Sequence, residues 1–394
     1  MAASAQGLTL PTIDVIGNTP LPGSAIDRDK IPSDVVSAPA SDFNHAVSPS
    51  LTDALVRALP GVSRGDTTGN QYQPNIDYRG FTASPVPGTP EGIAVYQNGT
   101  RINETFGDTV NWDLIPENAV NRMTLAPSNP VYGLNALGGA ISVEMKNGFN
   151  YQGAQAEVSG GSYGRIGGSA QAGGQKGNIA AYITADALND DGWRDFGLSS
   201  SRLRRVYLDV GAKGDKGEVH LSFTGADNKL HNVGPTPVEM LNQRWSSVYT
   251  WPQTTHNQLA FVQLNGNVQL TDMDTLQGNA YFRGLWQSHV DGNATDADVC
   301  PPPNILNLLC YGDNNVPLLN YSGVQVTNPG GTLGQIDRTW TSANSFGGSL
   351  QLTDTHQIVE HPNHFVLGVS VDHGRAHLSG TSELGTIDQN LFVQ

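Results

Sequence analysis

The sequence predicts a mainly β protein, in which a small α+β domain precedes the antiparallel strands of a transmembrane β-barrel. Charged residues make up only 14% of the 394 residues, well below the roughly 25% of soluble domains. The mean hydropathy is −0.31, and no apolar run of about 18 residues could form a membrane helix. Lipid-facing and lumen-facing residues alternate in a barrel, which keeps the mean hydropathy modest. A secreted, soluble all-β protein would fit the composition equally well.

Long alternating segments favour the barrel. Apolar and polar side chains alternate through residues 262–270 and again through 276–287, with a short turn at 271–274 between them. One face is apolar and the other is rich in amides, as a lipid exterior and a polar lumen require. Strands of a soluble sandwich usually have about five or six residues, and these segments are longer. The long loop 288–340 opposite the short turn is typical of outer-membrane barrels.

Residues 1–34 are predicted to be a flexible tail, because prolines interrupt any regular element. One β-prone island within the tail could add as a strand to the edge of a partner's sheet, and a fortuitous apolar patch is the alternative. The island consists of Thr12, Ile13, Asp14, Val15 and Ile16. The small residues at 3–5 resemble the end of a signal peptide, so we expect the export signal to have been trimmed.

A small α+β domain is predicted for residues 35–148. Its helix should span residues 48–59, with Ser48 able to cap it and Ser50 beginning a possible capping box. Pro60-Gly61 should end this helix, because proline cannot continue it and glycine adopts the backbone conformation of a helix stop.

Two tight turns should organise the strands of this domain. In a hairpin over residues 93–103, Asn98-Gly99 supplies the two positive φ angles of a type I′ turn. Further along, residues 120–145 contain two short strands separated by a Pro/Asn break, Tyr132-Gly133 and Gly138-Gly139. These glycines let the backbone turn where a Cβ would clash. Together the segments predict a compact sheet with sharp corners.

Several of these segments, in this order, resemble the plug domain of TonB-dependent outer-membrane receptors. The helical segment at 51–62 is similar to the first plug helix, and residues 76–81 match the family's Ile-x-x-Arg-Gly-Phe element. The stretch from Tyr132 to Ile141 resembles the Tyr-Gly…Gly-Gly…Ile pattern that closes the plug. The chain has Leu-Ala-Pro at 125–127, where the family usually has Arg-Gly-Pro.

This resemblance implies a plug at residues 35–148, followed at 149–394 by the N-terminal part of a barrel. Plugged barrels of this kind use about 22 strands, whereas this second region suffices for roughly nine or ten. We therefore expect the chain to be truncated and the barrel incomplete. The resemblance also implies a location in the outer membrane of a Gram-negative bacterium, in contact with its lipid.

The function implied by the resemblance is energy-coupled uptake of a scarce nutrient. The partner would be a TonB-type coupling protein that binds the island in the tail. The expected cargo is a small-molecule metal chelate of the ferric-siderophore or ferric-citrate type, with cobalamin, nickel chelates and oligosaccharides left open. The alternative is a secreted or surface-attached all-β adhesin or binding protein without transport activity.

Three plug residues are predicted to contact the cargo. In the resembling family, loops such as those after Arg79 and Asn103 face the external pocket, which makes Arg79, Asn103 and Phe106 candidates. The Arg79 guanidinium suits an anionic chelate, because its planar fork donates paired hydrogen bonds to carboxylates. The alternative is that Arg79 pairs with a barrel carboxylate.

The two cysteines, Cys300 and Cys310, lie close together in a Pro/Asn/Asp-rich stretch. A short loop closed by a disulfide in an oxidising compartment fits this spacing best. A metal site built from two thiols without a nearby histidine is much less favoured. We expect the pair to lie in an extracellular loop.

Several other function classes are disfavoured by the sequence. The net charge of −15 argues against nucleic acid as a partner. Arg202, Arg204 and Arg205 crowd together, and we expect them to be solvated or to face lipid headgroups. No phosphate-binding loop, metalloprotease motif or nucleophile elbow is present. The histidines are scattered, so we expect no enzyme activity, no metal site and no cofactor.

Overall fold

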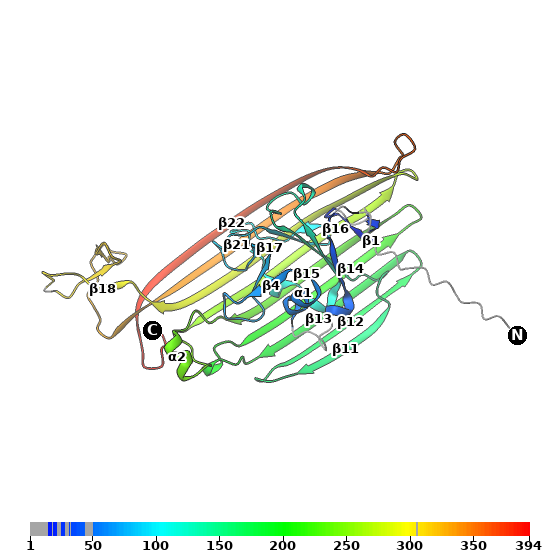
Figure 1. Ribbon diagram of the computed structural model, residues 1–394. Coiled ribbons are helices and arrows are strands. Elements are labelled where there is room, and N and C mark those ends of the chain that lie inside the picture. Colours follow the sequence, from blue (N-terminus) through cyan, green and yellow to red (C-terminus); the bar gives the residue numbers. More distant parts are fainter. Residues whose placement is uncertain are drawn as a thin grey trace.

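The computed structural model describes residues 15–17, 19–21, 25–27, 31, 33–43, 50–304 and 306–394 (Figure 1). Within this part of the chain, a small N-terminal domain packs against the concave face of a large antiparallel sheet. None of the described helices is long and apolar enough to cross a lipid bilayer. The β-prone island falls only partly within the described residues, because Thr12, Ile13 and Asp14 lie outside them.

The N-terminal domain is built on two small sheets. A five-stranded sheet has the order β3-β9-β10-β7-β8, and a three-stranded sheet has the order β4-β5-β6. Its strands are β3 (Val36–Pro39), β4 (Val62–Gly65), β5 (Asn75–Tyr78), β6 (Phe81–Ala83), β7 (Ile93–Gln97), β8 (Thr100–Arg101), β9 (Val120–Pro127) and β10 (Gly139–Met145). Its helices are η2 (Ala40–Phe43), α1 (Leu51–Ala58), η3 (Trp112–Leu114), η4 (Glu117–Ala119) and η5 (Pro130–Tyr132).

Helix α1 begins later than the sequence predicted. Its N-cap is Ser50, whose hydroxyl accepts a hydrogen bond from the Asp53 backbone N–H at 3.2 Å. The Ser50 hydroxyl also donates to the Asp53 carboxylate at 2.7 Å, so the predicted capping pair at Ser50 and Asp53 is confirmed. The alternative cap at Ser48 lies outside the described residues. The helix ends directly before Pro60-Gly61, as predicted.

The predicted turns adopt the backbone conformations that their residues favour. Strands β7 and β8 form a hairpin, and Asn98 and Gly99 between them have φ angles of 46° and 85°. At Gly138, an added Cβ would lie 2.5 Å from the Phe81 ring. At Gly139, it would lie 2.6 Å from the Ala126 carbonyl oxygen of the neighbouring strand β9. The Gly-Gly pair therefore allows the start of β10 to approach Phe81 of β6 and the backbone of β9 closely.

The second body is a nine-stranded antiparallel sheet whose strands follow one another in chain order. It is open, because its edge strands β11 and β22 do not pair with each other in the described residues. The strands are β11 (Gly153–Gly160), β12 (Ile166–Lys176), β13 (Ile179–Asp190), β14 (Ser201–Lys213), β15 (Gly217–His231), β16 (Gln253–Gln269), β17 (Asp274–Ala294), β21 (Thr332–Asp354) and β22 (Phe365–Ile387). Figure 1 shows the sheet curving around the N-terminal domain.

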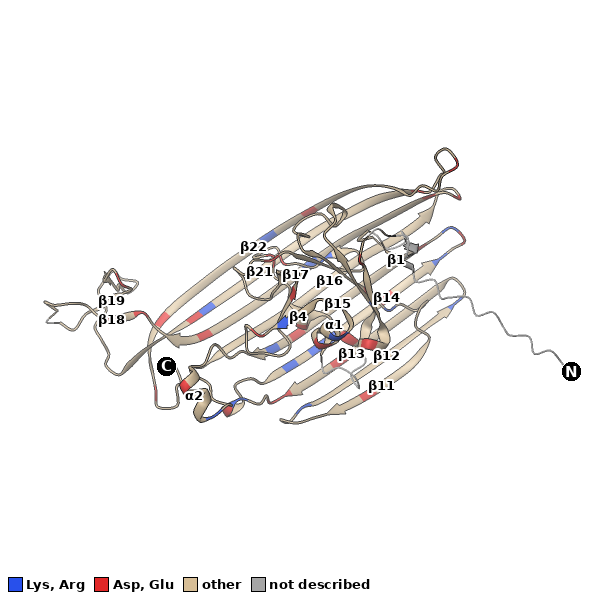
Figure 2. Ribbon diagram, in the orientation of Figure 1, with Lys and Arg blue, Asp and Glu red and all other residues tan. Residues whose placement is uncertain are grey.

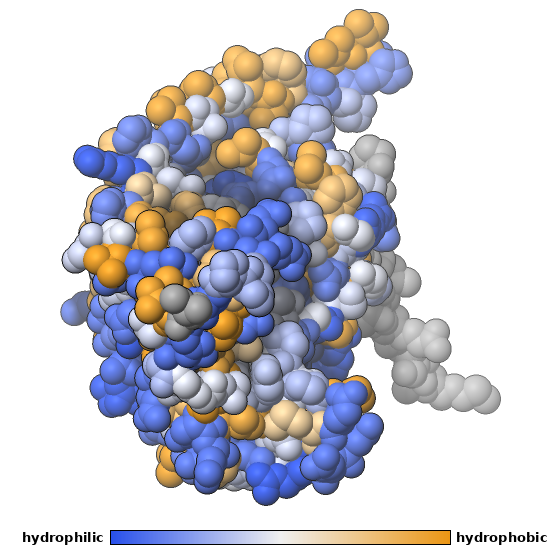
Figure 3. All heavy atoms as spheres, turned by 90° about the vertical axis from the view of Figure 1, so that its left-hand side faces the viewer, coloured by the Kyte–Doolittle hydropathy of each residue, from blue (hydrophilic) through white to orange (hydrophobic). Residues whose placement is uncertain are grey.

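The two ends of this sheet differ in their connections. At the end that we call the short-turn end, the strands are joined at 177–178, 214–216, 270–273 and 355–364. At the opposite, long-loop end, the connections are 161–165, 191–200, 232–252 and 295–331. The longer of these contain α2 (Val238–Gln243) and a small sheet of β18 (Ala297–Val299), β19 (Leu309–Tyr311) and β20 (Val316–Pro317). Hydrophilic residues cover most of the long-loop end (Figure 3).

The two faces of the large sheet have the predicted opposite character. Along β16, Phe261 and Gln263 are buried against the N-terminal domain, while the intervening Val262 is 41% exposed. An apolar row crosses the outer face in register through Leu208, Phe223, Val262, Phe282 and Phe346. Charged residues are sparse along the strands (Figure 2). The predicted alternation is therefore confirmed, with apolar residues outside and amides inside.

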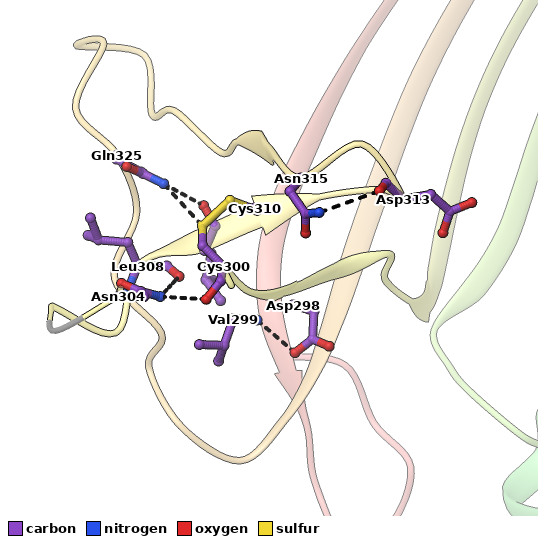
Figure 4. Close-up of a disulfide and its surroundings, with 10 residues drawn as sticks. Asp298, Val299, Cys300, Asn304, Leu308, Cys310, Asp313, Asn315 and Gln325 are labelled. Atoms are coloured by element: carbon purple, nitrogen blue, oxygen red, sulfur yellow. Dashed lines mark hydrogen bonds between the residues drawn. A yellow bond between two sulfur atoms is a disulfide. The ribbon is translucent and has the colours of Figure 1, made fainter. Parts of the chain in front are cut away.

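Cys300 and Cys310 form a disulfide in the longest loop, at the long-loop end (Figure 4). Asn304 fixes the chain between them, because its amide donates to the Leu308 carbonyl oxygen at 2.8 Å and accepts from the Leu308 N–H at 2.9 Å. The Gln325 amide also donates to the Leu309 carbonyl oxygen at 3.0 Å. The loop is thus cross-linked by side chains as well as by sulfur.

Replacing both cysteines, as Cys300→Ser with Cys310→Ser, should loosen this loop and leave the large sheet intact. A loop of this length should lose about 2–3 kcal/mol of local stability, since the reduced chain has more conformational freedom. Limited proteolysis should cut the variant within 295–331, while the heat-modifiable gel mobility of the barrel stays unchanged. Thiol labelling of the parent protein without reductant would contradict the disulfide.

Candidate functional site

A buried carboxylate lies at the centre of the contact between the N-terminal domain and the sheet. Asp113, on η3, is 2% exposed. Its carboxylate accepts hydrogen bonds from the side-chain amides of Asn228 at 2.9 Å, Asn257 at 3.2 Å and Gln73 at 3.3 Å. Burial raises the pKa of the Asp113 carboxyl, and these hydrogen bonds act in the opposite direction. Asn228 and Asn257 come from β15 and β16, so the contact fixes η3 to the sheet.

Arg205, on β14, joins the two bodies a short distance away. Its Nε donates to the Asp186 carboxylate at 2.9 Å. Its Nη1 donates to the Ile115 carbonyl oxygen at 3.0 Å and to the Glu117 carboxylate at 3.3 Å. The prediction that Arg205 is solvated or faces headgroups is wrong. Successive side chains of a strand point to opposite faces, which places Arg205 inside and Arg204 outside.

A second buried ion pair links the same two bodies. The Arg283 guanidinium, on β17, donates two hydrogen bonds to the Glu104 carboxylate, at 2.5 and 2.8 Å. Both side chains are at most 6% exposed. Two parallel bonds between planar groups fix orientation as well as distance. Removal of either partner would leave an uncompensated charge in the interface.

Side-chain amides of the large sheet also form hydrogen bonds with the β7–β8 hairpin. The Gln263 amide donates to the Asn98 carbonyl oxygen and to the Thr100 hydroxyl, both at 2.7 Å. The Asn279 amide donates to the Gly99 carbonyl oxygen at 3.0 Å. The interface is thus rich in hydrogen bonds, which water can replace if the domains separate. Such a contact can hold the domain firmly and still permit its rearrangement.

A cavity of about 580 Å³ opens toward the long-loop end, between the β4–β5 loop and the inner face of β11–β14. Three arginines and four carboxylates line it, so its formal charges nearly cancel. Asp190 is held in place by the Gln71 amide at 2.7 Å and the Tyr72 hydroxyl at 3.3 Å. Asp186 is 8% exposed, and its Oδ1 has no hydrogen-bond partner among the described residues. That oxygen is enclosed by protein atoms, so the cavity wall presents mainly the other polar groups that line it.

Aromatic side chains form part of the rim of this cavity. Trp193 lines it and stacks with Trp245 of the next long loop, with ring centroids 6.4 Å apart and an interplanar angle of 21°. The Arg194 guanidinium carbon lies 4.2 Å from the centroid of the Trp193 ring. Flat apolar surface beside hydrogen-bonding groups is the usual composition of a small-molecule site. This cavity is the candidate binding site.

The predicted cargo residues do not gather at this cavity. Arg79 lies in the turn between β5 and β6, at the other end of β5 from the cavity-lining loop. Its guanidinium carbon lies 5.0 Å from the centroid of the Tyr78 ring. Asn103 is 9% exposed and acts within the domain, because its amide accepts from the Val95 N–H and donates to the Ile93 carbonyl oxygen. Phe106 is half-buried in the following loop.

Asn103 does line a second cavity of about 960 Å³, which also includes residues of the edge strand β22. Neither Arg79 nor Phe106 lines either cavity. The residues that sequence analysis missed are Gln71, Asp186, Asp190 and Trp193. The alternation of β13 could have placed Asp186 and Asp190 on one face, but no local pattern indicates that the β4–β5 loop would meet them.

The described part of the β-prone island forms a strand. Residues Val15–Gly17 (β1) pair antiparallel with Ala25–Asp27 (β2). In Figure 1, β1 lies toward the short-turn end, opposite the loop that carries the disulfide. Strand β1 and the candidate binding cavity therefore lie toward opposite ends of the sheet.

Residues 27–140 match the family model of the TonB-dependent Receptor Plug Domain. The chain has the fold of TonB-dependent receptors, and this segment of it matches their plug domain. The plug belongs to receptors and transporters rather than to enzymes. A search of curated protein sequences finds no match.

Solved structures share this fold at low sequence identity. The ferripyoverdine-binding FpvA of P. aeruginosa matches with a TM-score of 0.62 and 13% identity, over 91% of this chain and 44% of its own. The ferric-catecholate import receptor Fiu of E. coli K12 matches with a TM-score of 0.54 and 14% identity, over 90% and 67%. The RagAB peptide importer matches with a TM-score of 0.59 and 11% identity, over 92% and 50%. The chain thus spans about half the length of the first and third.

Replacing one partner of the Glu104–Arg283 ion pair should reduce the stability of the plug. We expect Glu104→Gln or Arg283→Met each to cost about 3–5 kcal/mol of local stability, because each leaves one buried charge unpaired. The double variant should lose less than the sum of the two. Hydrogen exchange of the plug within the full receptor measures this difference.

The matched control is Arg338→Met, which breaks an ion pair with Glu383 whose side chains are 31% and 59% exposed. Exposed ion pairs contribute about 0–1 kcal/mol to stability, so the hydrogen exchange of the plug should not change in this variant. If the stability loss of the double variant equalled the sum of the losses in Glu104→Gln and Arg283→Met, the two side chains would not interact energetically and the prediction would be wrong.

Proposed function

We propose that this chain belongs to a receptor in the outer membrane of a Gram-negative bacterium, which imports a small molecule by TonB-type energy coupling. The observation that carries the proposal is the plug, held inside the curved sheet by buried ion pairs and amide hydrogen bonds. Such an interface closes the lumen at rest and can be hydrated when the plug is pulled. An adhesin without transport, the alternative from the sequence, would have no use for a removable domain.

The orientation of the receptor follows from the connections between its strands. Outer-membrane barrels have short periplasmic turns and longer extracellular loops. The cavity beside Trp193 then faces the exterior, where cargo arrives, and β1 faces the periplasm, where the coupling protein acts. In this proposed orientation the disulfide loop would also face the exterior.

The proposed coupling step is strand addition to β1. A TonB-type partner would pair its own strand with the backbone of the island and transmit force to the plug. Because β1 is paired with β2 on one side, the partner either adds at the other edge or displaces β2. Both routes require backbone N–H groups of residues 12–16.

The proposed cargo is a ferric chelate without a large negative charge. FpvA and Fiu are described with ferric pyoverdine and ferric catecholate, which supports the chelate class predicted from the sequence. The cavity holds about as many carboxylates as arginines, so a polyanion such as ferric citrate would meet repulsion as well as attraction. A neutral chelate would meet no net repulsion from these carboxylates and suits the nearly balanced lining better.

Direct titration of the full receptor with a neutral ferric trihydroxamate and with ferric citrate tests this cargo class. The neutral chelate should bind more tightly, and Trp193→Ala should weaken its binding about tenfold through lost aromatic contact. Trp286→Ala, on the outer face, is the control and should leave the affinity unchanged. Tighter binding of ferric citrate would overturn the proposed cargo class.

Proline substitutions in the island test the coupling step. Ile13→Pro and Val15→Pro each remove a backbone donor that strand addition needs, so uptake should fail while surface binding of cargo persists. Val15→Ala retains the backbone N–H and should support uptake. Normal uptake by both proline variants would contradict the assignment of the coupling segment.

A further inference from the structure

Two aspartates oppose each other at the short-turn end of the large sheet. Asp274 begins β17 and Asp354 ends β21, and the two residues are directly paired in the register of these strands. Directly opposed residues on one face of a sheet have Cβ atoms about 4.5–5.5 Å apart, and like charges at that distance destabilise the pair. Within the part of the chain that the structure describes, neither carboxylate forms an ion pair with a lysine or an arginine.

A histidine completes a group of three possible metal ligands. The His356 Nδ1 lies 2.9 Å from Asp354 Oδ2 and 3.8 Å from Asp274 Oδ1. Each of these side chains offers one ligand atom, and the three atoms all lie within 4.8 Å of one another. Among the described residues, no other three His, Cys, Asp or Glu side chains form such a group. Asp274 is remote from the other two in the chain, so the scattered histidines of the sequence did not indicate a metal site.

Neighbouring groups orient the two carboxylates. The Thr271 hydroxyl donates to Asp274 Oδ2 at 2.6 Å, and the His356 backbone N–H donates to Asp354 Oδ1 at 2.9 Å. Metal-ligating carboxylates are commonly held by such hydrogen bonds. Each aspartate therefore keeps its other oxygen next to the imidazole. Both aspartates are half-buried and His356 is exposed, so an ion can reach the group from solvent.

The two turns that carry this group are joined by the main chain. The Thr355 N–H and the Thr355 hydroxyl both donate to the Met273 carbonyl oxygen, at 2.9 and 3.0 Å. The separation of the turns is thus set by contacts other than those of the three ligands. Little rearrangement is needed for the ligands to close around a small ion.

The spacing of the ligand atoms suits a small transition-metal ion. Zinc binds nitrogen and oxygen ligands at about 2.0–2.2 Å in a tetrahedral arrangement, which separates neighbouring ligand atoms by about 3.3–3.6 Å. The two distances from the His356 Nδ1, 2.9 and 3.8 Å, lie on either side of that range. Calcium and magnesium prefer a shell made only of oxygen ligands, whereas an imidazole with carboxylates belongs to the ligand set of zinc.

We propose that Asp274, Asp354 and His356 bind a divalent transition-metal ion of the zinc class. Each aspartate would contribute one oxygen, the histidine its Nδ1, and water the fourth position. The ion would replace the hydrogen bond between the imidazole and Asp354, neutralise the opposed carboxylates and tie β17 to β21. The site lies at the opposite end of the sheet from the candidate binding cavity. It is therefore a structural site, independent of the cargo and of the proposed transport function.

Zinc binding to the full receptor, stripped of metal and kept in neutral detergent, tests the proposal. Competition with a chromophoric zinc chelator measures the affinity. Asp274→Asn and His356→Gln should each weaken zinc binding about tenfold or more, because even the outer partners of metal ligands contribute that much. The matched control is His361→Gln with His364→Gln, which removes two imidazoles of the same loop outside the group and should bind zinc as the parent does. Heat-modifiable gel mobility confirms that each variant is folded.

Hydrogen exchange locates the bound ion. Zinc should slow the exchange of residues 271–274 and 354–356 in the parent and leave it unchanged in His356→Gln. Three results would overturn the proposal: zinc binding that is absent from the parent or unaffected by His356→Gln, an equal loss of affinity in the control, or displacement of zinc by an equal concentration of calcium. The last result would show a site for oxygen-preferring cations, in which the imidazole has no part.

Discussion

The structure depends on buried polar contacts between the plug and the inner face of the sheet. A charge in such a place is tolerated only when it is paired and hydrogen-bonded. Glu104 therefore needs Arg283, and the Asp113 carboxylate needs amides from two strands of the sheet. Each domain supplies groups that would be unsatisfied without the other. These contacts fix the position of the plug against the sheet. They therefore also determine the shape of the candidate binding cavity between the β4–β5 loop and strands β11–β14.

Successive side chains of each strand point to opposite faces of the large sheet, so the two faces have different roles. Arg204 and Arg205 are neighbours in sequence, yet Arg205 holds the plug while Arg204 faces outward. One strand thus contributes to the polar inner face and to the apolar outer face of the sheet.

The same polar character suits the proposed transport function, in which the plug would have to move. An apolar contact between plug and sheet would be costly to expose to water, whereas hydrogen bonds exchange with water at a small net cost. The charged pairs are the exception, since they are strong and directional. The arrangement therefore combines a few specific attachments with many replaceable ones, and the candidate cavity shares Asp186 and Arg205 with the attachments.

The sequence by itself determined the local structure: the stop of α1 at Pro60-Gly61, the turn at Asn98-Gly99, the close approach at Gly138-Gly139, and the alternation of the long strands. Each follows from backbone preferences or from a short period. Only the tertiary structure decided that Asn103 holds its own domain together, that Arg79 lies away from the cavity, and that Arg205 is buried. The burial of Arg205 depends on partners far away in the chain, such as Ile115, which is 90 residues from it. Local patterns do not predict how the plug is placed against the sheet, because that placement depends on side chains from distant parts of the chain that meet across the interface.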